Sequence, residues 1–353
     1  INIKLWARYT HAIISAVKVK ELGEFGLVKQ LAKIAYEIQG KETAAGKQLL
    51  IGIGDDAAVW HGDTLIELAT ADSFIQDIHF TLAMTSWNEL GWKALATNLS
   101  DIAAMGGVPN YALVSLALPD DTEVEDVTNL YRGMMELGQQ FDIAIIGGDT
   151  SSSPLVAINI TVLGSTKGED MHILTRSAAK PGDKITVTGY LGAAAAGLEM
   201  LSKKIKISPE ASTSLKKAFF HPEPRIAEGH LLVEQGVKTA IDISDGLVSD
   251  LSHILKASRV GARIEIDRVP IHPAVQTNFG DRAIELALSG GEDYELLFTA
   301  SADVIGRISE KSPLPVTVIG DIVADKIGEI TLTDRQGKSI KLAKPGWEHF
   351  ATS

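Results

Sequence analysis

The sequence predicts an α/β protein with mixed α+β sheets and two domains, on three observations. Short apolar runs such as Leu49–Ile53 alternate with longer segments of helical periodicity such as Trp87–Met105. Pro181-Gly182-Asp183 interrupts this pattern, and new strands and helices follow it. The 353 residues suit two domains of about 100–200 residues each. We expect domains at residues 22–168 and 169–353, with residues 1–21 as an extension.

The first domain is expected to contain three helices and five strands. Apolar residues recur at helical spacing in the segments Glu24–Ile38, Trp87–Met105 and Val124–Phe141. The run Ile143–Ile146 is expected to be a buried strand that ends at Gly147. The other predicted strands are Leu49–Ile53, Leu65–Ala69, Tyr111–Leu118 and Leu155–Ser165.

The second domain is expected to resume the alternation. Its predicted helices are Gly192–Leu201, Glu223–Gln235 and a segment that ends at Ser258. Its predicted strands are Lys184–Thr188, Thr239–Ile243, Ala262–Ile266, Tyr294–Thr299 and Val316–Ile319.

Composition excludes several classes of function. The chain has no cysteine, so disulfides, thiolate metal sites and cysteine nucleophiles are absent. A net charge of −12 disfavours broad nucleic-acid binding, which needs clustered Lys and Arg. The sequence has no apolar run of about 18 residues, the length that a membrane span needs. We therefore expect a cytoplasmic protein that binds no membrane.

Aspartates recur after apolar strands and small residues, the pattern expected at the rim of a ligand site. Gly allows the backbone to approach an anion closely, and gathered carboxylates bind Mg²⁺. For any single aspartate, however, a turn or a helix cap explains the pattern at least as well. The segments are Gly54-Asp55-Asp56, Thr70-Ala71-Asp72, Gly147-Gly148-Asp149 and Asp242–Gly246, and Asp101 lies within a predicted helix. Together they indicate a Mg²⁺-dependent phosphate enzyme, although neither a P-loop nor a dinucleotide fingerprint is present.

The sequence resembles the thiamine-monophosphate kinases, within the superfamily of aminoimidazole ribonucleotide synthetase-like ATP enzymes. The resemblance runs in family order from about residue 22 to residue 350, and three of its motifs together are highly specific: IGIGDDAA, NLSDIAAMG and SGGEDYELLF. The matching stretches are Gly23-Glu24-Phe25, Ile51–Ala58, Gly91–Gly106, Ile146–Thr150, Ala240–Leu251, Ser289–Phe298 and Gly346–Phe350.

The resemblance implies a fold and a reaction. The fold is an N-terminal α/β domain whose sheet pairs with that of a second copy in a homodimeric sheet or barrel, followed by a C-terminal α/β domain. In the reaction, ATP phosphorylates thiamine monophosphate to thiamine diphosphate, a step of thiamine diphosphate biosynthesis, with several Mg²⁺ ions. The substrate phosphate oxygen is already ionised, so we expect direct in-line transfer without a covalent phosphoenzyme or a general base.

The resemblance also implies roles for individual residues, with Asp72 and Asp149 as the catalytic pair. The ATP contacts would be Gly148, Asp149, Arg176, Ser244 and Tyr131. The substrate contacts would be His79, Glu292 and Trp347. The Mg²⁺ ligands would be Asp56, Thr70, Asp72, Asp101, Asp149, Asp242 and Asp245.

Plainer explanations exist for four of these residues when each is taken alone. Arg176 could be a surface arginine, His79 a structural histidine and Trp347 a packing tryptophan. Glu292 could simply pair with a neighbouring cation.

Two alternative functions remain open at the level of sequence. One is another enzyme of the same superfamily, of the aminoimidazole ribonucleotide synthetase type. The absence of cysteine argues against the sister enzymes that use a Cys or selenocysteine. The other is an inactive nucleotide-binding paralogue, because Ala71 and Ser151–Ser153 depart from the family pattern.

Overall fold

Among the described residues there are two sheets, and the first has six strands and is mostly antiparallel. The computed structural model describes residues 48–62, 65–168 and 172–340, together with Gly26, Lys29 and Gly346. Only β4 and β5 run parallel. The first and last strands of the described sheet do not pair, so it is open and forms no barrel within one chain. The strand order is β1 (Leu49–Ile51), β2 (Ala58–His61), β3 (Ile66–Ile75), β6 (Ala157–Ser165), β4 (Val108–Leu118) and β5 (Ala144–Ser152).

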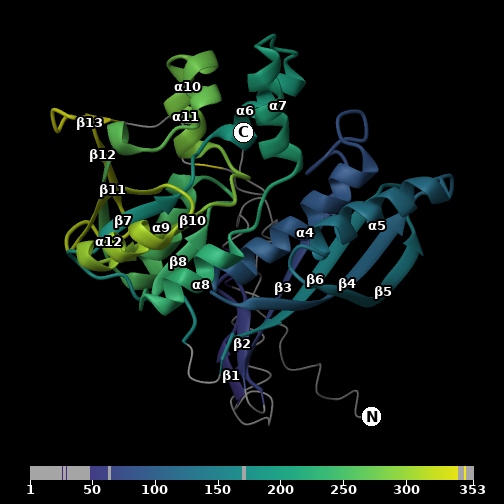
Figure 1. Ribbon diagram of the computed structural model, residues 1–353, viewed down its shortest axis with the longest axis horizontal. Helices are drawn as coiled ribbons and strands as arrows, with labels where there is room; N and C mark the ends of the chain where they lie inside the picture. Colours follow the sequence, from purple (N-terminus) through teal and green to yellow (C-terminus); the bar gives the residue numbers. More distant parts are fainter. Residues whose placement is uncertain are drawn as a thin grey trace, which may run out of the picture. The chain divides into compact units, whose positions relative to one another are not determined.

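Two helices, α4 (Trp87–Ala104) and α5 (Val124–Gly138), pack against each other beside this sheet (Figure 1). A capping box formed by Ser86 and Glu89 begins α4. A Cβ on Gly91 would lie 1.9 Å from the carbonyl oxygen of Leu130. Because no side chain fits in that space, glycine here allows the close approach of the two helices.

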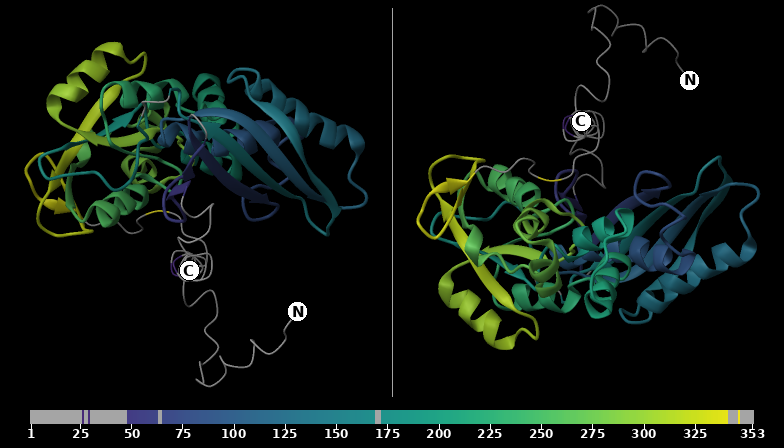
Figure 2. Two further views of the ribbon diagram at one scale, coloured as in Figure 1. Left: turned by 90° about the horizontal axis from the view of Figure 1, so that it is seen from below. Right: turned by 90° about the horizontal axis from the view of Figure 1, so that it is seen from above.

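The second sheet has seven strands within the part of the chain that the structure describes, and of these only β12 and β9 run parallel. Figure 2 shows both sheets from two further directions, the first in purple to teal and the second in teal to yellow. The strand order is β13 (Ser339–Ile340), β12 (Ile330–Thr333), β9 (Gly261–Glu265), β11 (Val316–Val323), β7 (Lys184–Thr188), β10 (Leu296–Ala300) and β8 (Thr239–Asp242).

Helices accompany the second sheet along the chain. None of the helices in the described ranges is long and apolar enough to cross a bilayer. The helices of this second region are α6 (Ala193–Ser202), α7 (Pro209–Phe220), α8 (Ile226–Glu234), α9 (Leu247–Ser258), α10 (Pro273–Phe279), α11 (Arg282–Ser289) and α12 (Ala302–Lys311), and a 3₁₀ turn lies at Ile266–Arg268.

Helix α4 links the two sheets through a shared core. Its apolar residues belong to one buried cluster with side chains of the six-stranded sheet and with Val233, Ala240, Leu296 and Phe298 of the following region. It contacts both α8 and β8. The C-terminal half of α4 therefore carries its polar residues toward the end of β8.

The structure corrects several expectations about single elements. Strand β3 continues to Ile75 and β5 to Ser152, so Asp72 and Asp149 lie inside strands and not after them. Strand β5 is largely exposed, whereas the sequence predicted a buried strand. Helices α7, α10, α11 and α12 and strands β2, β12 and β13 were not predicted. The predicted helix Glu24–Ile38 lies outside the described residues, apart from Gly26 and Lys29.

Candidate active site

Four aspartates from separate elements meet at one place, which we call the acidic centre: Asp56, Asp72, Asp101 and Asp242. Asp56 follows β1, Asp72 lies on β3, Asp101 on α4 and Asp242 at the end of β8. Carboxylate oxygens of Asp56, Asp101 and Asp242 lie within 4.8 Å of one another. Asp72 interacts electrostatically with Asp56 and Asp101. The fold thus joins acids that are up to 186 residues apart, from position 56 to position 242.

Hydroxyl groups satisfy some of these carboxylates and leave one oxygen without a partner. Thr70 donates a hydrogen bond of 2.5 Å to Asp101 Oδ2. Ser100 donates one of 2.7 Å to Asp242 Oδ2. The Oδ2 atom of Asp72 is buried and has no hydrogen-bond partner among the described residues. An unpartnered buried carboxylate oxygen costs free energy, so this atom needs a ligand of its own.

Burial makes three acids of the acidic centre, Asp72, Asp101 and Asp242, difficult to ionise. It raises the pKa of Asp72 to about 6 and that of Asp242 to about 7, and the charge of Asp56 adds to both shifts. Burial, with Asp72 and Asp242 nearby, raises the pKa of Asp101 well above its ordinary value. Like charges in a poorly solvated place repel one another unless cations lie between them. The centre is therefore suited to bind cations.

One cation comes from the chain itself. Burial alone would lower the pKa of Arg176, but Asp56 and Asp55 raise it. The guanidinium contacts both oxygens of Asp56, with Nη2–Oδ1 at 2.6 Å and Nε–Oδ2 at 3.2 Å. The pair Thr175–Thr239 bridges the Arg176 segment to β8. Arg176 is thus held at the acidic centre and is not a surface arginine.

The loop after β8 is held by a buried aspartate that sequence analysis did not single out. Asp250 Oδ2 accepts hydrogen bonds from the backbone N–H groups of Ser244, Asp245 and Gly246, at 3.1, 3.1 and 3.0 Å. The Ser244 carbonyl in turn accepts from the Glu292 N–H at 2.7 Å. These contacts fix Ser244 and Asp245 beside the end of β8.

Two of the three expected substrate contacts, His79 and Glu292, lie within the described residues, and their surroundings differ. His79 Nδ1 accepts a hydrogen bond of 3.0 Å from the N–H of Ile75, and its ring lies 5.8 Å from that of Phe74. Glu292 forms an ion pair with Lys93. Trp347 lies outside the described residues.

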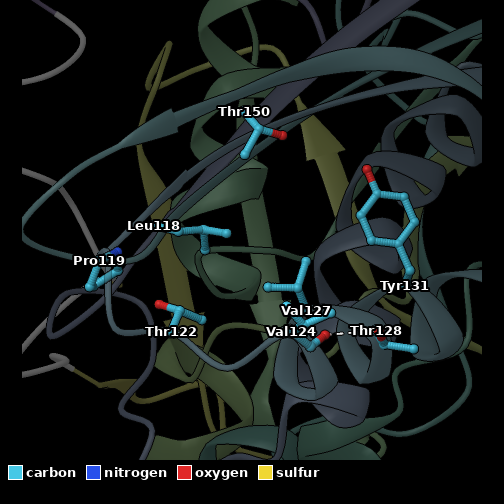
Figure 3. A pocket seen from close by; sticks show the side chains of 8 residues that line it. All are labelled: Leu118, Pro119, Thr122, Val124, Val127, Thr128, Tyr131 and Thr150. Carbon is cyan, nitrogen blue, oxygen red and sulfur yellow. Dashed lines mark hydrogen bonds between the residues drawn. The ribbon is translucent and has the colours of Figure 1, made fainter.

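A second region contains Gly148 and Asp149, which lie on strand β5, and Tyr131, which lies on α5. A pocket of about 500 Å³ opens here, and Tyr131 and Thr150 face each other across it (Figure 3). Since strand residues alternate between faces, Asp149 points away from the face that Thr150 lines. The pocket is lined by Leu118, Pro119, Thr122, Val124, Val127, Thr128, Tyr131 and Thr150.

Strand register separates this region from the acidic centre within one chain. Asp72 pairs with Ile160, Ile160 with Val114, and Val114 with Gly148. Three strand spacings amount to about 14 Å. A Cβ on Gly148 would lie 1.8 Å from the carbonyl oxygen of Val114, so the glycine is needed for strand packing whatever it binds. The structure therefore does not bring Asp149 to Asp56, Asp101 and Asp242.

Sequence analysis singled out Asp101 but missed the polar stripe of α4 to which it belongs. Lys93, Thr97, Ser100 and Asp101 follow the helical spacing i, i+4, i+7 and i+8. They interrupt a helix whose other residues on this side are apolar and buried. This helical spacing could have identified them from the sequence. Polar side chains on the buried face of a helix need hydrogen-bond or ionic partners, so such a stripe indicates a polar site.

Comparison with known proteins first places the chain in a class. Residues 54–166 match the N-terminal domain of AIR synthase related proteins, and residues 180–333 match the C-terminal domain of the same family. The acidic centre draws residues from both matched segments. A structure of AaThiL complexed with AMPPCP and TMP superposes with a TM-score of 0.81 at 31% identity, covering 95% of this chain and 99% of that one.

Curated relatives narrow the class to one family. The thiamine-monophosphate kinase of Bacillus subtilis is 38% identical over 85% of this chain and 93% of its own length. The thiamine-monophosphate kinase of Escherichia coli K12 is 38% identical over 86% of this chain and 92% of its own length. The chain belongs to the thiamine-monophosphate kinase family.

Proposed function

We propose that this chain uses ATP to phosphorylate thiamine monophosphate. The observation that carries this conclusion is the acidic centre, where four carboxylates from distant segments converge in a chain of this family. The similar AaThiL structure holds AMPPCP and TMP, which are an ATP analogue and the phosphate acceptor. Both substrates are anions, so a site that unites them needs positive charge between them.

The donors of the acidic centre fit Mg²⁺. All are hard oxygen ligands, three carboxylates lie within 4.8 Å, and Asp72 Oδ2 is buried without a partner. We assign Asp56, Thr70, Asp72, Asp101 and Asp242 to this ion group, with Asp245 beside it on the loop after β8. When bound, Mg²⁺ would neutralise phosphate charge and hold the reacting oxygens in line.

The chain's own residues would bind and orient the two substrates. Arg176, whose fork suits a phosphate, adds a permanent positive charge at the centre. Ser244 lies on the loop that Asp250 fixes, so its position is set before a substrate binds. Glu292, His79 and Trp347 are the proposed contacts of thiamine monophosphate. Since the acceptor oxygen is ionised, no residue has to remove a proton from it.

The pocket beside β5 is the proposed site of the nucleotide. Tyr131 presents an aromatic ring there, which can stack on a base, and Thr150 presents a hydroxyl. Gly148 and Asp149 immediately precede Thr150. We retain Asp149 as a proposed catalytic and metal-binding residue, although within one chain it lies apart from the acidic centre.

We further propose a cytoplasmic homodimer. Apolar side chains on β4 and β5 are exposed, namely Tyr111 at 50%, Leu113 at 37% and Ile146 at 55%. Such a patch favours burial against a second copy of the sheet. A homodimer would also change what lies near Asp149.

The experiment is a direct assay of thiamine diphosphate formation. The purified chain, ATP and thiamine monophosphate are incubated with MgCl₂ or with EDTA, and aminoimidazole ribonucleotide synthesis is assayed in parallel. We expect thiamine diphosphate and ADP in equal amounts with Mg²⁺ only. Tight ATP binding without product would instead identify an inactive paralogue.

A further inference from the structure

Lys93 is a charged residue inside a helix–helix contact, which is an unusual place for an ammonium group. It lies on α4 and is only 4% exposed. Burial lowers its pKa, and the charge of Glu292 opposes that shift. A buried lysine is retained only when partners compensate for the loss of hydration.

Its partners are an acid and an aromatic ring. The Nζ atom lies 2.8 Å from Glu292 Oε1 and 3.7 Å from the centroid of the Phe219 ring on α7. The ring face is negative, so both partners favour the ammonium form. Lys93 is therefore enclosed on one side and aimed at Glu292 on the other.

Glu292 occupies a backbone conformation that needs support. Its φ is +67° and that of Tyr294 is +49°, both in the left-handed region that residues other than glycine rarely adopt. The loop is fixed by the Glu292 N–H bond to the Ser244 carbonyl and by a contact of 3.2 Å between the hydroxyls of Tyr294 and Thr97. Thr97 follows Lys93 by one turn of α4, so adjacent turns of the same helix hold the loop.

The side chain of Glu292 remains accessible despite this support. It is 29% exposed, compared with 5% for the Lys93 side chain. Lys93 contacts Oε1, and no described residue donates a hydrogen bond to Oε2. One face of the carboxylate can thus meet a substrate while the other is held by the ammonium group.

We propose that Lys93 is a positioning residue that holds Glu292 ready for the thiamine part of the substrate. This inference rests on the proposed function and extends it to a residue outside the substrate contacts. Thiamine carries an aminopyrimidine and a positively charged thiazolium, and a fixed carboxylate suits the amino group or the charge. Lys93 acts through Glu292 and does not itself touch the reacting phosphates.

The test is a double-mutant cycle with Lys93→Met and Glu292→Gln, using the full chain, ATP and Mg²⁺. Methionine keeps most of the apolar volume of lysine and removes the charge. We expect K93M to raise KM for thiamine monophosphate about tenfold and to change kcat and KM for ATP less than about twofold. In the E292Q background the same substitution should raise that KM less than about twofold, because the partner is already altered.

A matched control removes another lysine of the same region. Lys217→Met on α7 breaks an ion pair of 2.7 Å between Lys217 and Glu223, whose side chains are 67% and 49% exposed, respectively. Because this pair is exposed, the substitution should leave the KM values for thiamine monophosphate and for ATP unchanged. Equal KM effects of K93M in both backgrounds, or a fall in kcat alone, would overturn the role of Lys93. If the wild-type chain makes no thiamine diphosphate, the proposed function fails and this inference fails with it.

Discussion

The acidic centre and the exposed strand β5 each contain an aspartate that lies on a strand, but in different surroundings. Asp149 follows glycines and lies on a strand that faces solvent along most of its length. Asp242 also lies on a strand, but it is 2% exposed and faces other carboxylates. Burial raises the pKa of Asp242 to about 7, so its ionised form is costly. The difference teaches that a cation site is indicated by the side chains that surround an aspartate in space, and not by the residues next to it in the sequence.

The largest expected effect is that of Asp101→Asn at the acidic centre. We expect kcat to fall at least about 10³-fold, because a cation ligand at the reacting phosphates is lost. In EDTA the same variant should be more stable than the wild type by about 1 kcal/mol, since one of several mutually repelling buried acids is gone. Activity assays and thermal unfolding measure the two effects.

The opposite signs of these effects make Asp101→Asn informative. MgCl₂ should raise the Tm of the wild type and should raise that of the variant less. A variant that loses stability in EDTA, or that retains full activity, would contradict the comparison between the two regions.

The next effect is that of Arg176→Met, which leaves Asp56 at the centre without its arginine. The side chain of Asp56 is 1% exposed, so its charge would be buried and unpaired. We expect the free energy of unfolding to fall by about 3 kcal/mol, measured by urea denaturation. The matched change Arg132→Met removes an exposed pair with Glu125 and should cost less than about 1 kcal/mol. Equal losses of unfolding free energy in the two variants would show that the buried Arg176–Asp56 pair contributes no more to stability than an exposed ion pair does.

A third effect concerns pH and an acid outside the proposed metal site. Burial raises the pKa of Asp293 to about 7, while hydrogen bonds from the N–H groups of Gly192 and Ala194 oppose the shift. The folded state then binds a proton that the unfolded state has released above about pH 4. Stability must therefore fall as the pH rises toward 7.

Asp293→Asn tests this linkage. Between pH 5 and pH 8 in EDTA, we expect the wild type to lose about 2 kcal/mol more than the variant. The variant gives up one hydrogen bond at every pH, so the readout is the pH slope and not the stability at one pH. Parallel profiles from urea denaturation at each pH would disprove the linkage.

The smallest expected effect on stability is that of Asp149→Asn. The side chain is exposed, so the free energy of unfolding should change by less than about 0.5 kcal/mol. A stabilisation as large as that expected for Asp101→Asn would show that Asp149 experiences as much charge repulsion as the acids of the acidic centre. A loss of activity without any change in Tm would support the proposed catalytic and metal-binding role of Asp149.

Helices and strands were predicted correctly from the sequence where a local hydrophobic periodicity or a short motif specifies them. The helices at Trp87 and Val124 and three of the six strands of the first sheet, β1, β4 and β6, were predicted within about three residues. It failed at Asp72 and Asp149, where strands continue through small residues that read as strand ends. Cross-strand hydrogen bonds keep these segments extended, and they depend on a partner strand that the local pattern does not reveal.

The sequence by itself determined the residue types, the order of most elements and the resemblance to a kinase family. Only the tertiary structure decided which acids share a buried place, that Arg176 binds Asp56 and that Lys93 supports Glu292. The physical reason is that ionisation depends on distance and solvation in space. Residues 120 or 199 positions apart, as in the Arg176–Asp56 and Lys93–Glu292 pairs, can be neighbours only after the chain has folded.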